Sequence, residues 1–444
     1  MGEYAQPPAP QPRSITGRYR VVVDGLQPNG EAHGTVVAVL AQPTDADFAQ
    51  LDGEQGAKTP QPESMNFIGA LPGEVVDVEL RWRVPPPGRR RHKRRQAPHA
   101  HVTAVIEPAP ERVAPRCQVF GECGGCQLQQ LAYPAQLAWK TGRVREALSA
   151  AGFAAPEVRP ALGCDPPWGY RNHMRFSVDR EGHAGLTARG SHRVLPLASC
   201  PIAHPRINAA LALLAEERLP RPQALVRCGD ATGQVLMQPA PAPDVAERLA
   251  AAGLAVRADE MEEELRGVRF RIRPSSFFQT NTRQANRLAG LVLERLPRGA
   301  GVTLVDAYCG VGTFARLLAD HVGKVFAIEE STSAIRDAGW NLRDVTNVDI
   351  VQAKVEDALP RIGERLDGLV IDPPRAGCQT PVLQALIERR VPAVVYVSCD
   401  PDTLARDLAY LCLAHGAYRL VSIQPLDMFP QTAHIECIAM LEAV

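Results

Sequence analysis

The stretch that decides the fold is VTLVDAYCGVGTF, residues 302–314. Its first half is apolar and rich in β-branched residues, which predicts a buried strand. Gly310 and Gly312 then predict a tight turn into a helix, where glycine lets the backbone approach a ligand closely. A lone Gly-x-Gly is often only a strand–helix turn. Phe314 and Ala315 follow without the third glycine of the dinucleotide-binding fingerprint.

Strand-like and helix-like segments alternate on the C-terminal side of this turn. The strand-like segments are VGKVFAIEE at 322–330, DGLVIDPP at 367–374 and AVVYVSCDP at 393–401. This alternation predicts a doubly wound, Rossmann-like α/β domain over residues 271–444 with a mainly parallel sheet.

Two acids stand at the positions where such a domain binds its cofactor. Asp306 precedes the glycine turn, and Glu329 closes the next strand, where a carboxylate accepts hydrogen bonds from ribose hydroxyls. Together with the absent third glycine, these acids favour S-adenosylmethionine over a nicotinamide cofactor.

The N-terminal part of the chain has a different pattern. Short alternating segments with Gly, Pro and Asn between them occur at 15–40, 67–80 and 101–106. They predict a small all-β barrel over residues 14–107, with a polar loop at 41–66. Residues 108–270 are expected to form a central α+β domain, which includes an amphipathic helix ending near Gly152.

Composition sets outer bounds on the protein. The 444 residues are 45% hydrophobic and 22% charged with zero formal net charge, as in ordinary globular proteins of two or three domains. No apolar run approaches the roughly 20 residues that span a bilayer, and the Pro-rich start lacks a signal core. We therefore expect a cytoplasmic monomer with no membrane segment. The basic run RRRHKRR at 89–95 is either a solvated loop or a phosphate-binding patch.

Cys399 lies at the end of a predicted strand, at the edge where open α/β sheets bind ligands. An isolated cysteine of this kind is more often a small core residue. Three other residues favour a chemical role: Asp372 ends the preceding strand, Gln279 lies just before the α/β domain, and Glu436 lies near the end of the sequence.

This combination resembles the RNA (uracil-5-)-methyltransferase family. Its two signature stretches are matched by DPPRAG (372–377) with YVSCDPDT (396–403), and by LDMFPQTAHIE (426–436). The resemblance implies that Cys399 is the nucleophile and Glu436 the general base. It also implies a cofactor and target-base site lined by Gln279, Tyr308, Thr313, Glu329 and Asp372.

The chemistry of that reaction explains why a thiol and a carboxylate are needed. Carbon 5 of uracil is a poor nucleophile, and a thiolate that adds to carbon 6 places electron density on it. Carbon 5 then takes the sulfonium methyl group, and a base removes its proton so that the thiol is eliminated. One departure from the family is Asp400, where an asparagine usually follows the cysteine. The family's adenine-side contact is expected within 354–357.

The cysteines include one close cluster. There are eleven in a sequence without an export signal, so disulfides are not expected. Cys117, Cys123 and Cys126 form C-x5-C-x2-C, a chelating loop suited to zinc or to a [4Fe–4S] cluster. Either needs a fourth ligand, for which Cys164 and Cys200 are candidates. Family members with this spacing hold an iron–sulfur cluster and have a distant Cys-Pro, which implies Cys200. Nothing in the sequence supplies a redox partner, so a structural use of the cluster is favoured over a redox use.

The N-terminal segment resembles a TRAM domain, an OB-like barrel that binds RNA. Phe67 is expected in its core, and Trp82 either in the core or stacked on a base. A TRAM domain together with an iron–sulfur cluster resembles the branch of the family that acts on 23S rRNA; the alternative substrate is uridine 54 in the T loop of tRNA.

Two other classes compete with this interpretation. Asp372-Pro-Pro resembles the loop of amino-group methyltransferases, but those enzymes place an aromatic residue where this sequence has Arg375. A non-catalytic RNA-binding module with a methyltransferase fold would have no use for Cys399 and Glu436. In the favoured class the target uridine must leave its stack, which costs least in an RNA loop.

Overall fold

The computed structural model describes residues 14–44, 62–83, 99–215, 218–219 and 223–444. The basic run at 89–95, the Pro-rich start and most of the predicted loop at 41–66 lie outside these described residues. The chain divides into two compact units, one of residues 1–121 and 125–132, the other of residues 122–124 and 133–444. Each unit is described by itself.

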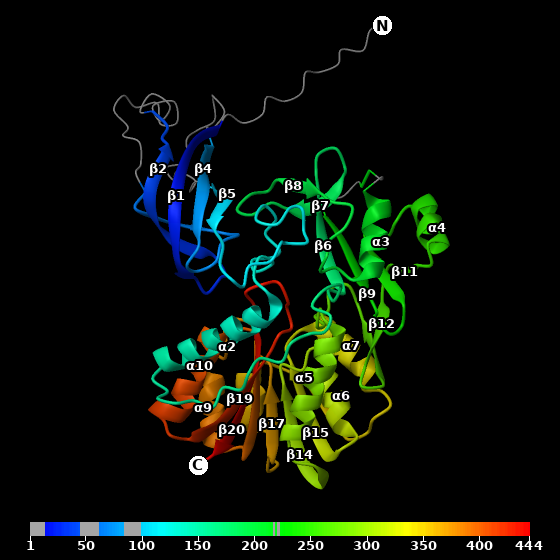
Figure 1. The fold of residues 1–444 in the computed structure, drawn as a ribbon. Coiled ribbons are helices and arrows are strands. Elements are labelled where there is room, and N and C mark those ends of the chain that lie inside the picture. The colour runs from blue at the N-terminus through cyan, green and yellow to red at the C-terminus, as the bar shows by residue number, and fades with distance from the viewer. Residues whose placement is uncertain (1–13, 45–61, 84–98, 216–217, 220–222) are drawn as a thin grey trace, which may run out of the picture. The chain divides into compact units, whose positions relative to one another are not determined.

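The first unit contains a five-stranded antiparallel sheet in the order β3-β2-β1-β4-β5 (Figure 1). Its strands are β1 (Ser14–Leu26), β2 (Ala32–Ala41), β3 (Ser64–Phe67), β4 (Val75–Arg83) and β5 (His99–Glu107). The two outer strands approach each other through an isolated bridge between Ile68 and His101. Phe67 lies in the core as predicted, and Trp82 is buried there too, so neither ring is available to stack on a base.

The second unit begins with the predicted amphipathic helix, α2 (Tyr133–Ala150). A six-stranded sheet follows in the order β11-β10-β9-β6-β7-β8, together with a β12–β13 hairpin. These strands are β6 (His173–Val178), β7 (Ala184–Thr187), β8 (Val194–Pro196), β9 (Gln223–Cys228), β10 (Gln234–Gln238), β11 (Ala255–Arg257), β12 (Met261–Leu265) and β13 (Val268–Ile272). The accompanying helices are α3 (Pro205–Leu214) and α4 (Pro243–Ala251).

The predicted α/β domain is present as a seven-stranded sheet in the order β16-β15-β14-β17-β18-β20-β19. The five parallel strands from β16 to β18 are joined by the antiparallel hairpin of β19 and β20. The strands are β14 (Gly299–Ala307), β15 (Val322–Glu329), β16 (Val348–Gln352), β17 (Gly368–Ile371), β18 (Ala393–Ser398), β19 (Tyr418–Leu426) and β20 (Glu436–Ala443). Its central strands are buried on both faces, which explains why β17 and β18 are almost continuously apolar.

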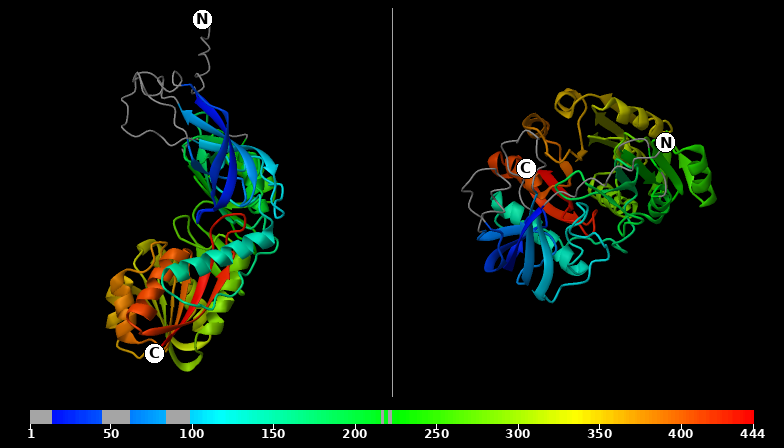
Figure 2. Two further views of the ribbon diagram at one scale, coloured as in Figure 1. Left: turned by 60° about the vertical axis from the view of Figure 1, so that its left-hand side comes forward. Right: turned by 90° about the horizontal axis from the view of Figure 1, so that it is seen from above.

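Helices cover both faces of this sheet (Figures 1 and 2). On one face, α5 (Thr282–Arg295), α6 (Thr313–Ala319) and α7 (Thr332–Asn341) contribute to a single apolar cluster. On the other, α2 packs with α8 (Val355–Ala358), α9 (Thr380–Arg389) and α10 (Pro401–Ala409). No helix within the described residues is both long and apolar enough to cross a membrane.

Candidate active site

The site lies where the parallel strands end. Strands β14, β15, β17 and β18 run in the same direction, so their carboxyl ends meet at one edge of the sheet. Glu329 is the last residue of β15, and Asp372 and Cys399 directly follow β17 and β18. Three residues predicted from separate stretches of sequence therefore lie along one edge.

The glycine turn after β14 is built for close approach of a ligand. Gly310 and Gly312 have φ values of 55° and 84°, in the left-handed region that glycine tolerates best. Within the described part of the chain, nothing lies within 4 Å of where a Cβ of Gly310 would stand. At Gly312, which begins α6 just before Thr313, a Cβ would stand 3.2 Å from Leu342 Cδ1.

Glu329 is held against this turn by backbone amides. Gly310 N donates to Glu329 Oε2 at 3.1 Å, and Ser331 N donates to Oε1 at 2.8 Å. A carboxylate has about four lone-pair positions, so acceptor capacity remains for two ribose hydroxyls. The open glycine turn and this half-buried carboxylate fit the ribose side of S-adenosylmethionine.

Tyr308 is the first residue after β14 and begins the same turn. It is half-buried with a φ of 64°, an uncommon value for a residue with a Cβ. Burial raises the pKa of its hydroxyl, and the negative charges of nearby groups, Glu356 among them, raise it further. Glu356 lies in the first turn of α8, within the segment expected to supply the adenine-side contact.

Asp306 lies beneath the turn and is fully buried. Its Oδ2 accepts a hydrogen bond from Ala315 N at 2.7 Å, so it holds the start of α6 against β14. Its Oδ1 has no hydrogen-bond partner among the described residues. Burial raises the pKa of Asp306 to about 7, and the charges of Asp372 and Glu329 add to the increase.

Cys399 and Glu436 come from distant parts of the sequence and influence each other electrostatically. The pKa of the Cys399 thiol is raised to about 11, chiefly by burial. The charge of Glu436 contributes to the increase, and the charge of Arg375 opposes it. Burial followed by the charge of Asp372 raises the pKa of Glu436 well above its ordinary value, again opposed by Arg375. The pKa of Asp372 itself is raised by burial to about 7. The predicted nucleophile Cys399, the predicted general base Glu436 and the carboxyl group of Asp372 therefore lie in one site.

Arg375 was quoted in the sequence motif without a role, and the structure supplies one. Its guanidinium is the cation that faces both Cys399 and Glu436. Its Nη2 also donates to His434 Nδ1 at 2.7 Å. Desolvation and the charge of Arg375 lower the pKa of His434 to about 4, so the imidazole is neutral and accepts this bond.

Asp400, the departure from the family pattern, caps the helix that follows the nucleophile. Its Oδ1 accepts hydrogen bonds from the backbone amides of Asp402 at 3.0 Å and Thr403 at 3.2 Å, at the N-terminus of α10. Asparagine fills the same position with its side-chain oxygen, and both residues are among the preferred N-caps. The change from amide to carboxylate therefore preserves the local structure next to Cys399.

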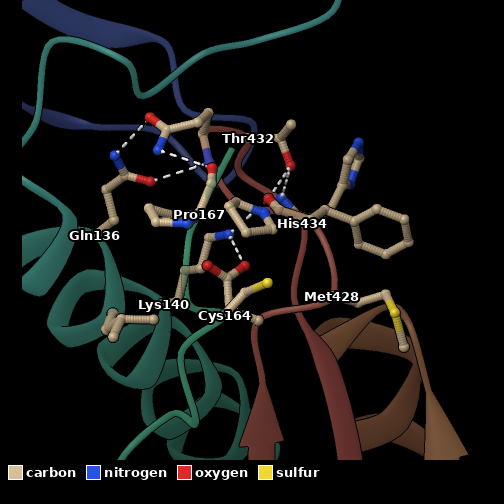
Figure 3. Close-up of polar contacts among 12 residues, drawn as sticks. Gln136, Lys140, Cys164, Pro167, Met428, Thr432 and His434 are labelled. Atoms are coloured by element: carbon tan, nitrogen blue, oxygen red, sulfur yellow. Dashed lines mark hydrogen bonds and ion pairs between the residues drawn. The ribbon is translucent and has the colours of Figure 1, made fainter. Parts of the chain in front are cut away.

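Gln279 lies between β13 and α5 and is half-buried. Its backbone oxygen accepts a hydrogen bond from Asn172 Nδ2 at 3.1 Å. Two residues later, Asn281 Nδ2 donates to the Met428 oxygen at 3.1 Å. Met428 belongs to the connection between β19 and β20 that leads to Glu436 (Figure 3), so the two predicted site segments are linked.

Phe277 is a further residue that the sequence did not single out. Its side chain is 70% exposed, two residues before Gln279. A large aromatic ring held in water beside a site for a nucleobase is suited to stacking. The sequence SSFFQTN contains both phenylalanines, but it does not show which of them is exposed. In the structure Phe278 is buried.

The predicted metal ligands are divided between the two units. Cys117 and Cys126 belong to the first unit, whereas Cys123 and Cys200 belong to the second. Among the described residues, no three His, Cys, Asp or Glu side chains are grouped so as to hold a metal ion. The iron–sulfur cluster is therefore not confirmed and stays a prediction.

Known proteins similar to this chain agree with the geometry of the site. A family described as tRNA (Uracil-5-)-methyltransferase matches residues 245–444. An uncharacterized RNA methyltransferase of Thermosynechococcus vestitus is 38% identical over 420 residues, covering 84% of this chain and 91% of the relative. One from Gloeobacter violaceus is 35% identical, covering 84% and 90%. The chain belongs to the uracil-5 family of RNA methyltransferases.

Membership of this family makes the protein an S-adenosylmethionine-dependent RNA methyltransferase. A solved structure shares its fold: the tRNA (uracil-54, C5)-methyltransferase of Pyrococcus abyssi in complex with S-adenosyl-L-homocysteine. It is 23% identical with a TM-score of 0.66, and the match covers 95% of this chain and 99% of that one.

The raised pKa of Asp306 predicts a stability change with pH. An unfolded aspartate loses its proton near pH 4, whereas folded Asp306 keeps it to about pH 7. Between these values the unfolded state binds fewer protons, so the free energy of unfolding falls as pH rises. We expect Asp306→Asn to flatten this fall, as measured by urea unfolding at pH 4, 5.5 and 7. Parallel curves for the two proteins would show that Asp306 is not the titrating group.

Proposed function

We propose that this enzyme methylates carbon 5 of a uridine in 23S rRNA through a covalent adduct with Cys399, with Glu436 as the general base. The observation that carries the reaction is the joint placement of Cys399, Glu436, Asp372 and Arg375 at the carboxyl edge of the sheet. A thiol, a buried carboxyl and a cation together provide what addition to a pyrimidine and later elimination require. The cytoplasm is the proposed location, and the monomer the proposed state.

The first step depends on the thiolate of Cys399. In the resting protein burial keeps the thiol protonated, and the Arg375 guanidinium favours the thiolate. The thiolate sulfur forms a bond to carbon 6 of the uracil, and the ring electrons move toward carbon 5 and oxygen 4. Asp372, whose pKa is raised by burial to about 7, is proposed to hydrogen-bond the polar edge of the uracil.

The later steps depend on Glu436. Bound S-adenosylmethionine supplies an electrophilic methyl group, and the residues proposed to hold it are Gln279, Tyr308, Gly310, Gly312, Thr313, Glu329 and Asp372. Once carbon 5 carries the methyl group, Glu436 removes its remaining proton. The electrons of that C–H bond re-form the ring double bond as the bond between carbon 6 and sulfur breaks. Burial raises the pKa of Glu436 well above its ordinary value, which strengthens its carboxylate as a base.

The choice of 23S rRNA rests on domain architecture. The five-stranded sheet of the first unit supports a TRAM-type barrel, and a TRAM domain with an iron–sulfur cluster is typical of the rRNA branch. Uridine 54 of tRNA is the alternative, favoured by the fold shared with the Pyrococcus abyssi tRNA enzyme. A shared fold does not by itself carry a substrate, so the two are separated by experiment.

We propose that the cluster is a [4Fe–4S] centre held by Cys117, Cys123, Cys126 and Cys200. Four thiols are the donor set that such a cluster takes. The surroundings of Cys164 support its exclusion: its sulfur lies 3.6 Å from Asn281 Nδ2 and 3.5 Å from the Pro166 oxygen, within the network of the second unit. The proposed cluster holds the loop at 117–126 in a fixed shape, and no step of the methylation passes through it.

Cys399→Ala tests the nucleophile. With RNA tritiated at carbon 5 of uridine, wild-type enzyme is expected to release tritium as it transfers methyl groups, and the variant to do neither while still binding S-adenosylmethionine. Cys412→Ala, which removes another half-buried thiol, is the matched control and should keep full activity. Release by the alanine variant would exclude Cys399, and methyl transfer by wild type without release would indicate an amino-group methyltransferase.

Mapping of 5-methyluridine in a deletion strain tests the RNA. We expect one position in 23S rRNA to lose its methyl group and to regain it when the wild-type gene is restored, whereas the Cys399→Ala gene restores nothing. Loss of the methyl group at position 54 of tRNA, with 23S rRNA unchanged, would instead establish the alternative.

Iron analysis tests the cluster. Protein purified without oxygen is expected to be brown and to contain iron and sulfide in equal amounts. Cys200→Ala should lower the iron content sharply because a thiolate ligand is lost, and Cys164→Ala should leave it unchanged. Colourless protein with one zinc per chain would show that the loop binds zinc.

A further inference from the structure

The connection between β19 and β20, residues 427–435, is held mainly from outside the hairpin. Leu426 and Glu436 pair across its base, so the proposed catalytic base is the first residue after this connection. Gln431 within it has a φ of 70°, an unfavourable value for a residue with a Cβ, which persists only where neighbours impose it. Several of the contacts that hold this shape come from α2, almost 300 residues earlier in the sequence. Tyr170, Asn281 and Gln284 supply others.

Lys140 of α2 is fully buried and paired with Asp427 at the start of the connection. Its Nζ lies 2.5 Å from Asp427 Oδ1 and donates to the Phe429 oxygen at 3.0 Å. Tyr133, also in α2, donates to the other oxygen of Asp427 at 2.8 Å. Both oxygens of the carboxylate are thus engaged by one helix.

Gln136, one turn before Lys140, forms a two-way amide contact with Gln431. Its Nε2 donates to Gln431 Oε1 at 3.0 Å, and Gln431 N donates to its Oε1 at 3.1 Å (Figure 3). Gln136 is 1% exposed and Gln431 is 2% exposed. A buried amide pair of this kind fixes the strained backbone of Gln431 in one orientation.

These polar residues are not needed to attach α2 to the domain. The helix buries Val144, Ala147 and Leu148 in the apolar cluster on the sheet. Replacement of a buried ion pair by apolar residues is often neutral or stabilising, so such a pair is weak evidence for a role in stability. Gln136 and Lys140 instead contact the connection at 427–435, which carries His434 (Figure 3).

We propose that Gln136 and Lys140 are positioning residues that set the place of Glu436 relative to Cys399. This inference rests on the proposed role of Glu436 as the base. A proton is transferred only within hydrogen-bond reach of the base, and a displacement of about 1 Å can slow a reaction by roughly 100-fold. A displaced Glu436 leaves addition and methyl transfer in place but slows removal of the carbon-5 proton. The bond between carbon 6 and Cys399 then fails to break.

The test uses Gln136→Met and Lys140→Met in the full-length protein. Each is expected to lower kcat by roughly 10- to 100-fold with little change in KM for RNA. Each should also accumulate a protein–RNA adduct that survives denaturing gels and carries the methyl group from radiolabelled S-adenosylmethionine. Gln136→Met changes no charge, so it decides the question if Lys140→Met fails to fold.

Two controls separate the possible outcomes. Arg145→Gln removes a contact of the same helix with the Val158 oxygen and should behave as wild type. Glu436→Gln should accumulate the methylated adduct most strongly, and its failure to do so would overturn the proposed base itself. If Glu436→Gln accumulates the adduct but folded Gln136→Met does not, whether kcat is unchanged or lowered, the positioning role is wrong.

Discussion

The constraint on which this site depends is the burial of carboxyl groups at one edge of a parallel sheet. Asp306, Asp372 and Glu436 all have pKa values raised chiefly by loss of water. Carboxyl groups packed near one another are costly to ionise together, so the charge of one raises the pKa of the next. The fold tolerates this cost because each of the three carboxyl groups has a use. Asp306 holds a helix in place, and Asp372 and Glu436 are proposed to act on the target uracil.

Arg375 places a positive charge beside two of the groups in this site, Cys399 and Glu436. Its charge opposes the raised pKa values of both groups. It also forms a hydrogen bond to His434, in the connection that leads to Glu436. The motif DPPRAG therefore supplies an acid and a cation three residues apart that affect the same two reactive groups. A neutral residue at position 375 would leave the raised pKa values of Cys399 and Glu436 without this opposing charge.

Features that depend on neighbouring residues were predictable from the sequence. The strand, turn and helix over 302–314 are set by local apolar pattern and by glycine, and they appear as expected. The antiparallel sheet of the first unit and the helix at 133–150 followed from the same kind of signal.

Features that depend on distant residues were not predictable in this way. Lys140 and Asp427 are 287 positions apart, and a lysine in an amphipathic helix is usually on the exposed face. Their burial follows only from the packing of α2 beside the β19–β20 connection. The location of the Trp82 ring could not be predicted for a similar reason, since the sequence of a strand does not show which face of the sheet is covered. The cysteines predicted as metal ligands lie in two units, so their spacing alone does not assemble a site.

The raised pKa of Cys399 has a consequence for the life of the enzyme between turnovers. Thiolates are the form of cysteine that oxidants and electrophiles attack, whereas neutral thiols react slowly. With a pKa of about 11, the half-exposed sulfur of Cys399 is almost entirely protonated in the cell. The proposed nucleophile is thus chemically unreactive until a bound uracil changes its surroundings.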